Sequence, residues 1–154
     1  MKLEDFDFEK MEESLKKIKK MRPEIIEKTI NVEWRLGEII IRWFDIKDNL
    51  KFRMKFLYGN RPISFSKKIE VLKEFLKEFK SGKYKTLSNK IDRIRVIRNH
   101  FAHSPPGAFE YPVIISKFRP IKAEDEFKEF NKLFLECLPK LDEIIKELKE
   151  KQSV

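Results

Sequence analysis

The sequence is poor in several residue types, and each shortage excludes a class of protein. The 154 residues include one cysteine and four glycines. A lone cysteine, Cys137, excludes an intramolecular disulfide and leaves no cluster for zinc or an iron–sulfur centre, so we expect neither metal nor cofactor. Four glycines are too few for a sandwich or barrel of many short strands, or for a glycine-rich phosphate loop. These shortages favour a mostly helical intracellular protein.

Long apolar runs are also missing. The longest, such as 39–41 and 113–115, contain only a few residues, whereas a membrane span needs roughly 18 to 20. The first residues interleave charged and apolar side chains where an export signal requires an uninterrupted apolar core. We therefore expect a cytoplasmic protein with no membrane contact.

The chain combines a large apolar fraction with a large charged one. Hydrophobic residues make up 41% of it and charged residues 40%. The first fraction supplies a core, and the second describes a polar exterior rather than disorder. A chain of 154 residues has the length of one domain, which we expect to span 1–154.

Apolar residues recur at spacings of three and four in five segments, which predicts helices. Pro23 suits the first turn of one helix, and Ser64 or Ser66 can cap another. The fold class predicted is all-α, a compact bundle of about five helices with a short extended arm or hairpin, 109–120, before the last one. Segment 45–61 is compatible with a short helix or an irregular loop. The predicted helices cover 5–21, 23–44, 64 or 66 to 79, 86–103 and 124–149.

Positive charge is concentrated in the middle of the chain. The net charge is +9, and residues 80–103 hold seven basic side chains and one acidic one. Such a stretch is an electrostatic footprint for a polyanion such as RNA or DNA. A lysine-rich surface that is merely solvated is the alternative. The RNA contacts predicted from this stretch are Lys83, Lys85, Lys90 and Arg95.

Two charged residues stand on apolar helix faces. Arg98 lies within the apolar face of 86–103, and Glu33 lies in the middle of the apolar face of 23–44. Because a charge on a buried face needs a partner, we hypothesise that Glu33 and Arg98 meet as an ion pair. The alternatives are a Glu33 that reaches solvent and an Arg98 that is purely structural. Gly37, on the same face as Glu33, permits close backbone approach there.

The string IRVIRNHFAH at 94–103 resembles the signature of HEPN domains, which are small helical proteins. That signature is an arginine, a polar residue and then a histidine, and Arg98, Asn99 and His103 match it at the spacing Arg-x4-His. The pieces NVEWRLGEIIIRWF and ISFSKKIEVLKEF are similar to the helices that precede the signature. The resemblance therefore covers 23–103.

This resemblance implies a metal-independent endoribonuclease whose site forms where two subunits bring their motif helices together. It assigns Arg98, Asn99 and His103 to the catalytic site, with RNA as substrate and a homodimer as the active form. It also implies the toxin of a toxin–antitoxin or defence module, with a nucleotidyltransferase-like antitoxin as partner.

The residue types suit RNA cleavage through the ribose 2′-hydroxyl, which needs a base, an acid and a cation. Two chains bring two copies of His103, one as acid and one as base, while Asn99 holds the tautomer and Arg98 grips the phosphate. Residues five apart on a helix point about 140° from each other. Therefore the helix distorts, Arg98 reaches around it, or the pair comes from two chains. Glu33 and His100, which is one turn from His103, are supporting residues.

A catalytically silent HEPN-like scaffold that binds a partner protein or a nucleotide is the alternative function. Sequence-specific DNA binding by the 86–103 helix fits the charge but not the apolar face of that helix. Loss of thermal stability in Arg98→Ala would mark a structural arginine, whereas loss of cleavage with the fold kept would mark a catalytic one.

Overall fold

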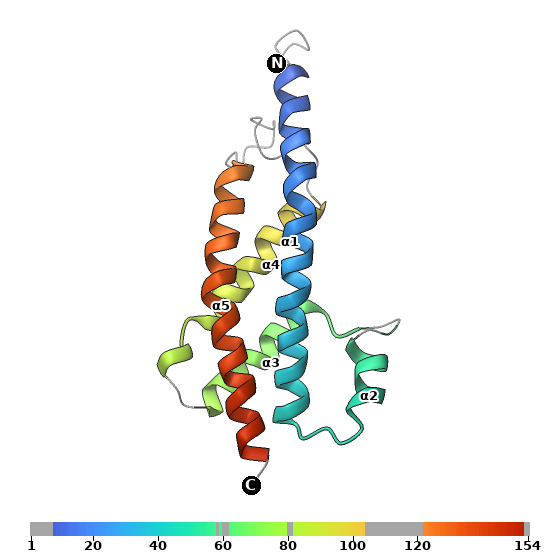
Figure 1. Ribbon diagram of the computed structural model, residues 1–154, viewed down its shortest axis with the longest axis vertical. Coiled ribbons are helices and arrows are strands. Elements are labelled where there is room, and N and C mark those ends of the chain that lie inside the picture. Colours follow the sequence, from blue (N-terminus) through green and yellow to red (C-terminus); the bar gives the residue numbers. More distant parts are fainter. Residues whose placement is uncertain (1–7, 58, 60–61, 80–81, 104–121, 153–154) are drawn as a thin grey trace.

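The computed structural model describes residues 8–57, 59, 62–79, 82–103 and 122–152 (Figure 1). Within these ranges the chain is helical and has no strand, which confirms the predicted all-α class. The arm or hairpin predicted for 109–120 lies outside the described residues. No described helix is long and apolar enough to cross a membrane. The α-helices in the described ranges are α1 (Phe8–Trp43), α2 (Asn49–Phe52), α3 (Phe65–Glu78), α4 (Leu87–His103) and α5 (Ala123–Gln152).

Helix α1 is a single helix of 36 residues. The prediction of two helices that meet at Pro23 is therefore wrong. Proline removes one backbone donor and usually kinks or ends a helix. Pro23 is exposed, so water can satisfy the carbonyl group that it leaves unpaired, while Ile18 and Ile25 on either side of it are both buried in the core. Packing before and after the proline favours one helix.

The long helices form a bundle in which α1 and α5 lie side by side and run in the same direction, with α3 and α4 behind them (Figure 1). Helix α4 contacts α1, α3 and α5, so it sits at the centre of the packing. Its residues Ile91, Ile94, Ile97 and Phe101 are fully buried. Each such side chain contributes about 1.5–3 kcal/mol by leaving water. The position of α4 is therefore firmly fixed.

The predicted limits of the last three helices agree with the structure to within a few residues. Helix α3 begins after Ser64, whose Oγ accepts a hydrogen bond from the backbone N–H of Lys67 at 3.2 Å. This bond satisfies one of the free donors at the helix start and confirms Ser64 as the cap. Helices α4 and α5 follow the apolar stripes from which they were predicted.

Segment 45–61 contains α2 and a π-helical turn, Arg53–Leu57. The side chain of Leu57 is buried against α1. A Cβ atom on Gly37 would lie 2.8 Å from Cδ1 of Leu57, so glycine at this position makes room for the leucine. The close approach predicted at Gly37 is thus made by the side chain of Leu57.

Candidate active site

The last two turns of α4 carry the residues of the predicted site. The side chains of Arg98, Asn99 and His100 are half-buried, and that of His103 is exposed. The opposite side of the same turns is anchored by Ile97 and Phe101, which are fully buried. A rigid core therefore holds a short polar segment at the helix end.

Arg98 and Asn99 interact with each other. Nη1 of Arg98 donates to Oδ1 of Asn99 at 3.1 Å. No hydrogen bond between Asn99 and His103 occurs among the described residues. The contact by which Asn99 was predicted to orient His103 is therefore not formed in this structure. A guanidinium has five N–H donors, so Arg98 retains donors for a phosphate.

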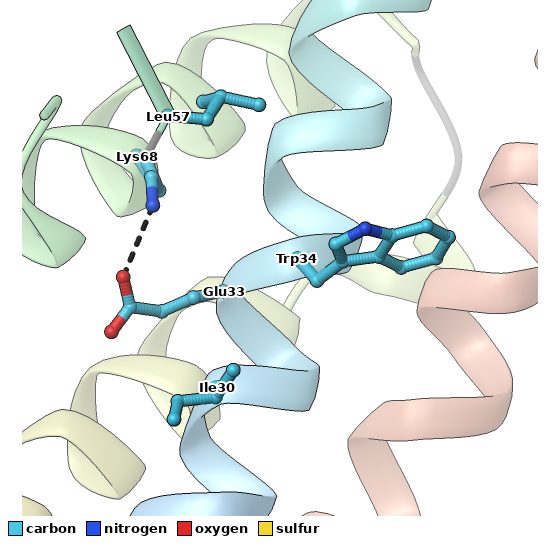
Figure 2. Close-up of a pocket in the computed structure, with 5 residues that line it drawn as sticks. All are labelled: Ile30, Glu33, Trp34, Leu57 and Lys68. Atoms are coloured by element: carbon cyan, nitrogen blue, oxygen red, sulfur yellow. Dashed lines mark hydrogen bonds and ion pairs between the residues drawn. The ribbon is translucent and has the colours of Figure 1, made fainter. Parts of the chain in front are cut away.

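Glu33 does not pair with Arg98. Its Oε2 accepts from Nζ of Lys68 at 3.0 Å, and the two side chains point toward each other in Figure 2. The predicted Glu33–Arg98 ion pair is therefore wrong. The physical reason is that α3 supplies the counter-charge at this level of α1, because Lys68 is itself buried and needs a carboxylate.

The Glu33–Lys68 pair lines a cavity of about 210 Å³ between α1, α3 and the π-helical turn. Ile30, Trp34 and Leu57 complete its lining. Trp34 points away from the ion pair in Figure 2, so the polar part of the cavity is Lys68 and Glu33 alone. This cavity is separate from the residues at the end of α4.

A second polar contact joins α4 to the first turn of α5. Nδ1 of His100 lies 2.8 Å from Oε2 of Glu126, whose side chain is only 3% exposed. The other oxygen of Glu126 accepts from Nη2 of Arg93 at 3.0 Å, and Arg93 also donates to Glu129 at 2.9 and 2.7 Å. A histidine is thus held by a buried carboxylate that a guanidinium also engages.

Sequence reasoning missed Glu126, although a signal was present. Glu126 stands four positions before Phe130 and three after Ala123, on the buried stripe of α5. A charged residue on an apolar stripe is the same signal that selected Glu33 and Arg98. It predicts a polar partner from a neighbouring helix, here His100 and Arg93 of α4.

The predicted RNA contacts are largely engaged in ion pairs within the chain. Lys83 pairs with Glu143, Lys90 with Glu136 at 2.5 Å and Arg95 with Asp92 at 2.8 Å. Lys85 is exposed, and no ion pair of Lys85 occurs in the part of the chain that the structure describes. The sequence stretch 80–103 is poor in acids, but α5 supplies the partners of Lys83 and Lys90 across the helix contact.

These ion pairs also lower the pKa of two carboxylates. The pKa of Glu143 and that of Glu136 lie below the usual value because Lys83 and Lys90 donate hydrogen bonds to the ionised forms.

The described residues contain no group of three or more His, Cys, Asp or Glu side chains placed to hold a metal ion.

Comparison of the chain with family models, with curated proteins and with solved structures found no significant match.

Proposed function

We propose that the chain is a metal-independent endoribonuclease of the HEPN type that acts as a homodimer. The observation that carries the proposal is the gathering of one guanidinium, Arg98, and two imidazoles, His100 and His103, within the last two turns of α4. Together with Asn99 they reproduce the Arg-x4-His signature at the end of a helix. The toxin of a toxin–antitoxin or defence module is the biological role that this activity suits.

The chemistry follows from these side chains. A neutral imidazole takes the proton of the ribose 2′-hydroxyl, and the oxygen attacks the adjacent phosphorus. The bond between phosphorus and O5′ then breaks, and an imidazolium gives its proton to O5′. The products are a 2′,3′-cyclic phosphate and a 5′-hydroxyl, so no water or metal ion is consumed. A guanidinium stabilises the charge that develops on the phosphate oxygens.

A dimer resolves the angle between Arg98 and His103. The two residues point about 140° apart on one helix. If the ends of two α4 helices meet across a two-fold axis, Arg98 of one chain and His103 of the other can face the same phosphate. Lys85, exposed and without an ion pair among the described residues, is the predicted RNA contact that can meet a phosphate without first giving up a carboxylate.

The test is incubation of the protein with end-labelled RNA in excess EDTA. The wild type is expected to leave 2′,3′-cyclic phosphate ends, and Arg98→Ala and His103→Ala are each expected to lower the cleavage rate by roughly 10²-fold or more. Both variants should keep their helical content and melting temperature, since Arg98 bonds only to its neighbour Asn99 among the described residues.

Arg35→Ala is the matched control. Arg35 is an arginine of α1 that pairs with Asp142 of α5 at 2.7 Å, outside the end of α4. It should cleave RNA like the wild type. Cleavage that requires a divalent metal ion, or that survives in both site variants, would contradict the proposal.

A catalytically silent scaffold that binds a partner protein is the second candidate. Leu50 is 69% exposed and Met54 is 63% exposed, and they lie one turn apart on α2 and the π-helical turn. Neighbouring exposed apolar side chains are typical of a surface that another protein covers. Intact RNA with the wild-type protein and strong destabilisation by Arg98→Ala would favour this candidate.

A further inference from the structure

His100 lies outside the Arg-x4-His signature. Its contact with Glu126 determines which of its two ring nitrogens carries the proton. Glu126 is buried and cannot turn toward water, and the Arg93 guanidinium donates to the same carboxylate. Such a carboxylate acts as an acceptor, so Nδ1 of His100 must donate to it. In a neutral imidazole the other nitrogen, Nε2, then carries the free lone pair.

The free nitrogen of His100 is available to a substrate. Nδ1 and Nε2 lie on opposite edges of the ring, so Nε2 points away from the buried carboxylate. The His100 side chain is 31% exposed, and no described residue forms a hydrogen bond with its Nε2. An imidazole with a fixed donor on one edge and an open acceptor on the other has the arrangement of a general base.

We infer that His100 is the general base of the proposed ribonuclease and that Glu126 is the residue that positions it. This inference rests on the proposed function and names residues that the signature does not contain. His100 takes the 2′-hydroxyl proton at Nε2, and the resulting imidazolium is stabilised by Glu126. His103 gives its proton to O5′ as the bond between phosphorus and O5′ breaks.

One chain then supplies both imidazoles of a site. Residues three apart on a helix have Cβ atoms about 5–6 Å apart, and the two rings extend outward from there, so a phosphate can contact both. The second chain of a dimer then needs to contribute only its Arg98 guanidinium. The charged groups that contact the His100–Glu126 pair are Arg93 of α4 and, through Arg93, Glu129 of α5. Neither α1 nor α3 adds one among the described residues.

The first measurement reads the tautomer of His100 without any RNA. The chain has two histidines, so His103→Ala leaves the signals of His100 alone. At about pH 8.5, roughly two units above the ordinary histidine pKa, the ¹⁵N chemical shifts of a labelled sample show which ring nitrogen carries the proton. We expect the proton on Nδ1.

The second measurement is the cleavage of mixed-sequence single-stranded RNA in excess EDTA. In His100→Asn the amide nitrogen takes roughly the place of Nδ1 and can still donate to Glu126, but it cannot accept a proton. We expect a loss of roughly 10²-fold or more in kcat/KM and the disappearance of the acidic limb of its pH profile. Glu126→Gln, which keeps size but not charge, should lose less.

Glu129→Gln is the matched control. It neutralises a carboxylate of the same helix that binds the same Arg93, but it does not contact His100. It should cleave RNA like the wild type, with the same pH profile.

Two results would overturn the inference. One is a proton on Nε2 of His100, which decides the matter whether or not RNA is cut. The other is a folded His100→Asn variant that cleaves RNA like the wild type, because the histidine would then only join α4 to α5. If the wild type leaves the RNA intact, the ribonuclease proposal fails and the base role fails with it, while the tautomer still shows whether Glu126 orients His100.

Discussion

Charged side chains on apolar helix faces are the most informative residues of this chain. The same sequence signal has three different outcomes. Glu33 pairs with a buried lysine, Arg98 bonds to the next residue along the helix, and Glu126 holds a histidine and an arginine. The signal therefore predicts that a partner exists, but not whether that partner comes from a neighbouring helix, as for Glu33 and Glu126, or from the same helix, as for Arg98.

Cys137 shows how burial controls the reactivity of a residue. Its side chain is fully buried in the core, and loss of solvation raises the pKa of its thiol to about 11. Because the thiolate is the reactive form, we predict that Cys137 in the folded protein does not react with iodoacetamide at neutral pH. Mass spectrometry should find it unmodified in buffer and alkylated in denaturant. Rapid alkylation of the folded protein would show that α5 is not packed as described.

At the scale of elements, α4 and α5 are joined by a row of ion pairs beside their apolar contact. Lys90 and Arg93 of α4, and Lys83 in the turn just before α4, all reach carboxylates of α5. Arg93 lowers the pKa of Glu129 by a hydrogen bond to the ionised carboxylate. The two helices are therefore held together more strongly when these carboxylates are ionised.

This row predicts how stability depends on pH. The pKa of Glu129 is lower in the folded chain than the value of about 4.3 expected in the unfolded chain. Its contribution is therefore complete above the unfolded pKa and is lost as the pH falls through the folded pKa. Urea unfolding between about pH 6 and pH 3 should show a falling free energy of unfolding.

Arg93→Gln tests the assignment. In this variant the free energy of unfolding should decrease less between these pH values than it does in the wild type. The difference should be at most about 1 kcal/mol, because Glu129 is 43% exposed and solvent screens the pair. An identical pH dependence in the wild type and Arg93→Gln would remove Arg93 as the cause.

At the scale of the whole molecule, the excess of positive charge is less available than the sequence implies. Of the four predicted RNA contacts, Lys83, Lys90 and Arg95 already have a carboxylate partner. A cation that is already paired gains less from a phosphate, since it must first give up its carboxylate. Lys85 is exposed without such a partner among the described residues.

We therefore predict that Lys85→Gln weakens RNA binding more than Lys83→Gln does. Fluorescence anisotropy with labelled single-stranded RNA over a range of salt concentrations measures this. Loss of one phosphate contact should reduce the slope of log affinity against log salt by about 0.7. Equal losses for the two variants would mean that the pairing of Lys83 with Glu143 breaks on binding.

The sequence by itself determined the helical class and the limits of α3, α4 and α5. Helix periodicity, capping by Ser64 and apolar stripes are local properties, because each depends on residues within a few positions of one another. The same local information placed Arg98, Asn99, His100 and His103 together at one helix end. It failed at Pro23, where packing on both sides of the proline keeps α1 continuous through a residue that locally favours a break.

Only the tertiary structure decided which charges meet. The partners of Glu33, His100 and Lys83 lie 35, 26 and 60 positions away in the sequence. Such pairs depend on which helix faces which, and on the level at which the helices cross, and neither is encoded in a local pattern. The packing against α5 thus gave carboxylate partners to Lys83, Lys90 and Arg93 of the basic stretch, and it gave His100 a buried carboxylate that sequence reasoning had not connected to it.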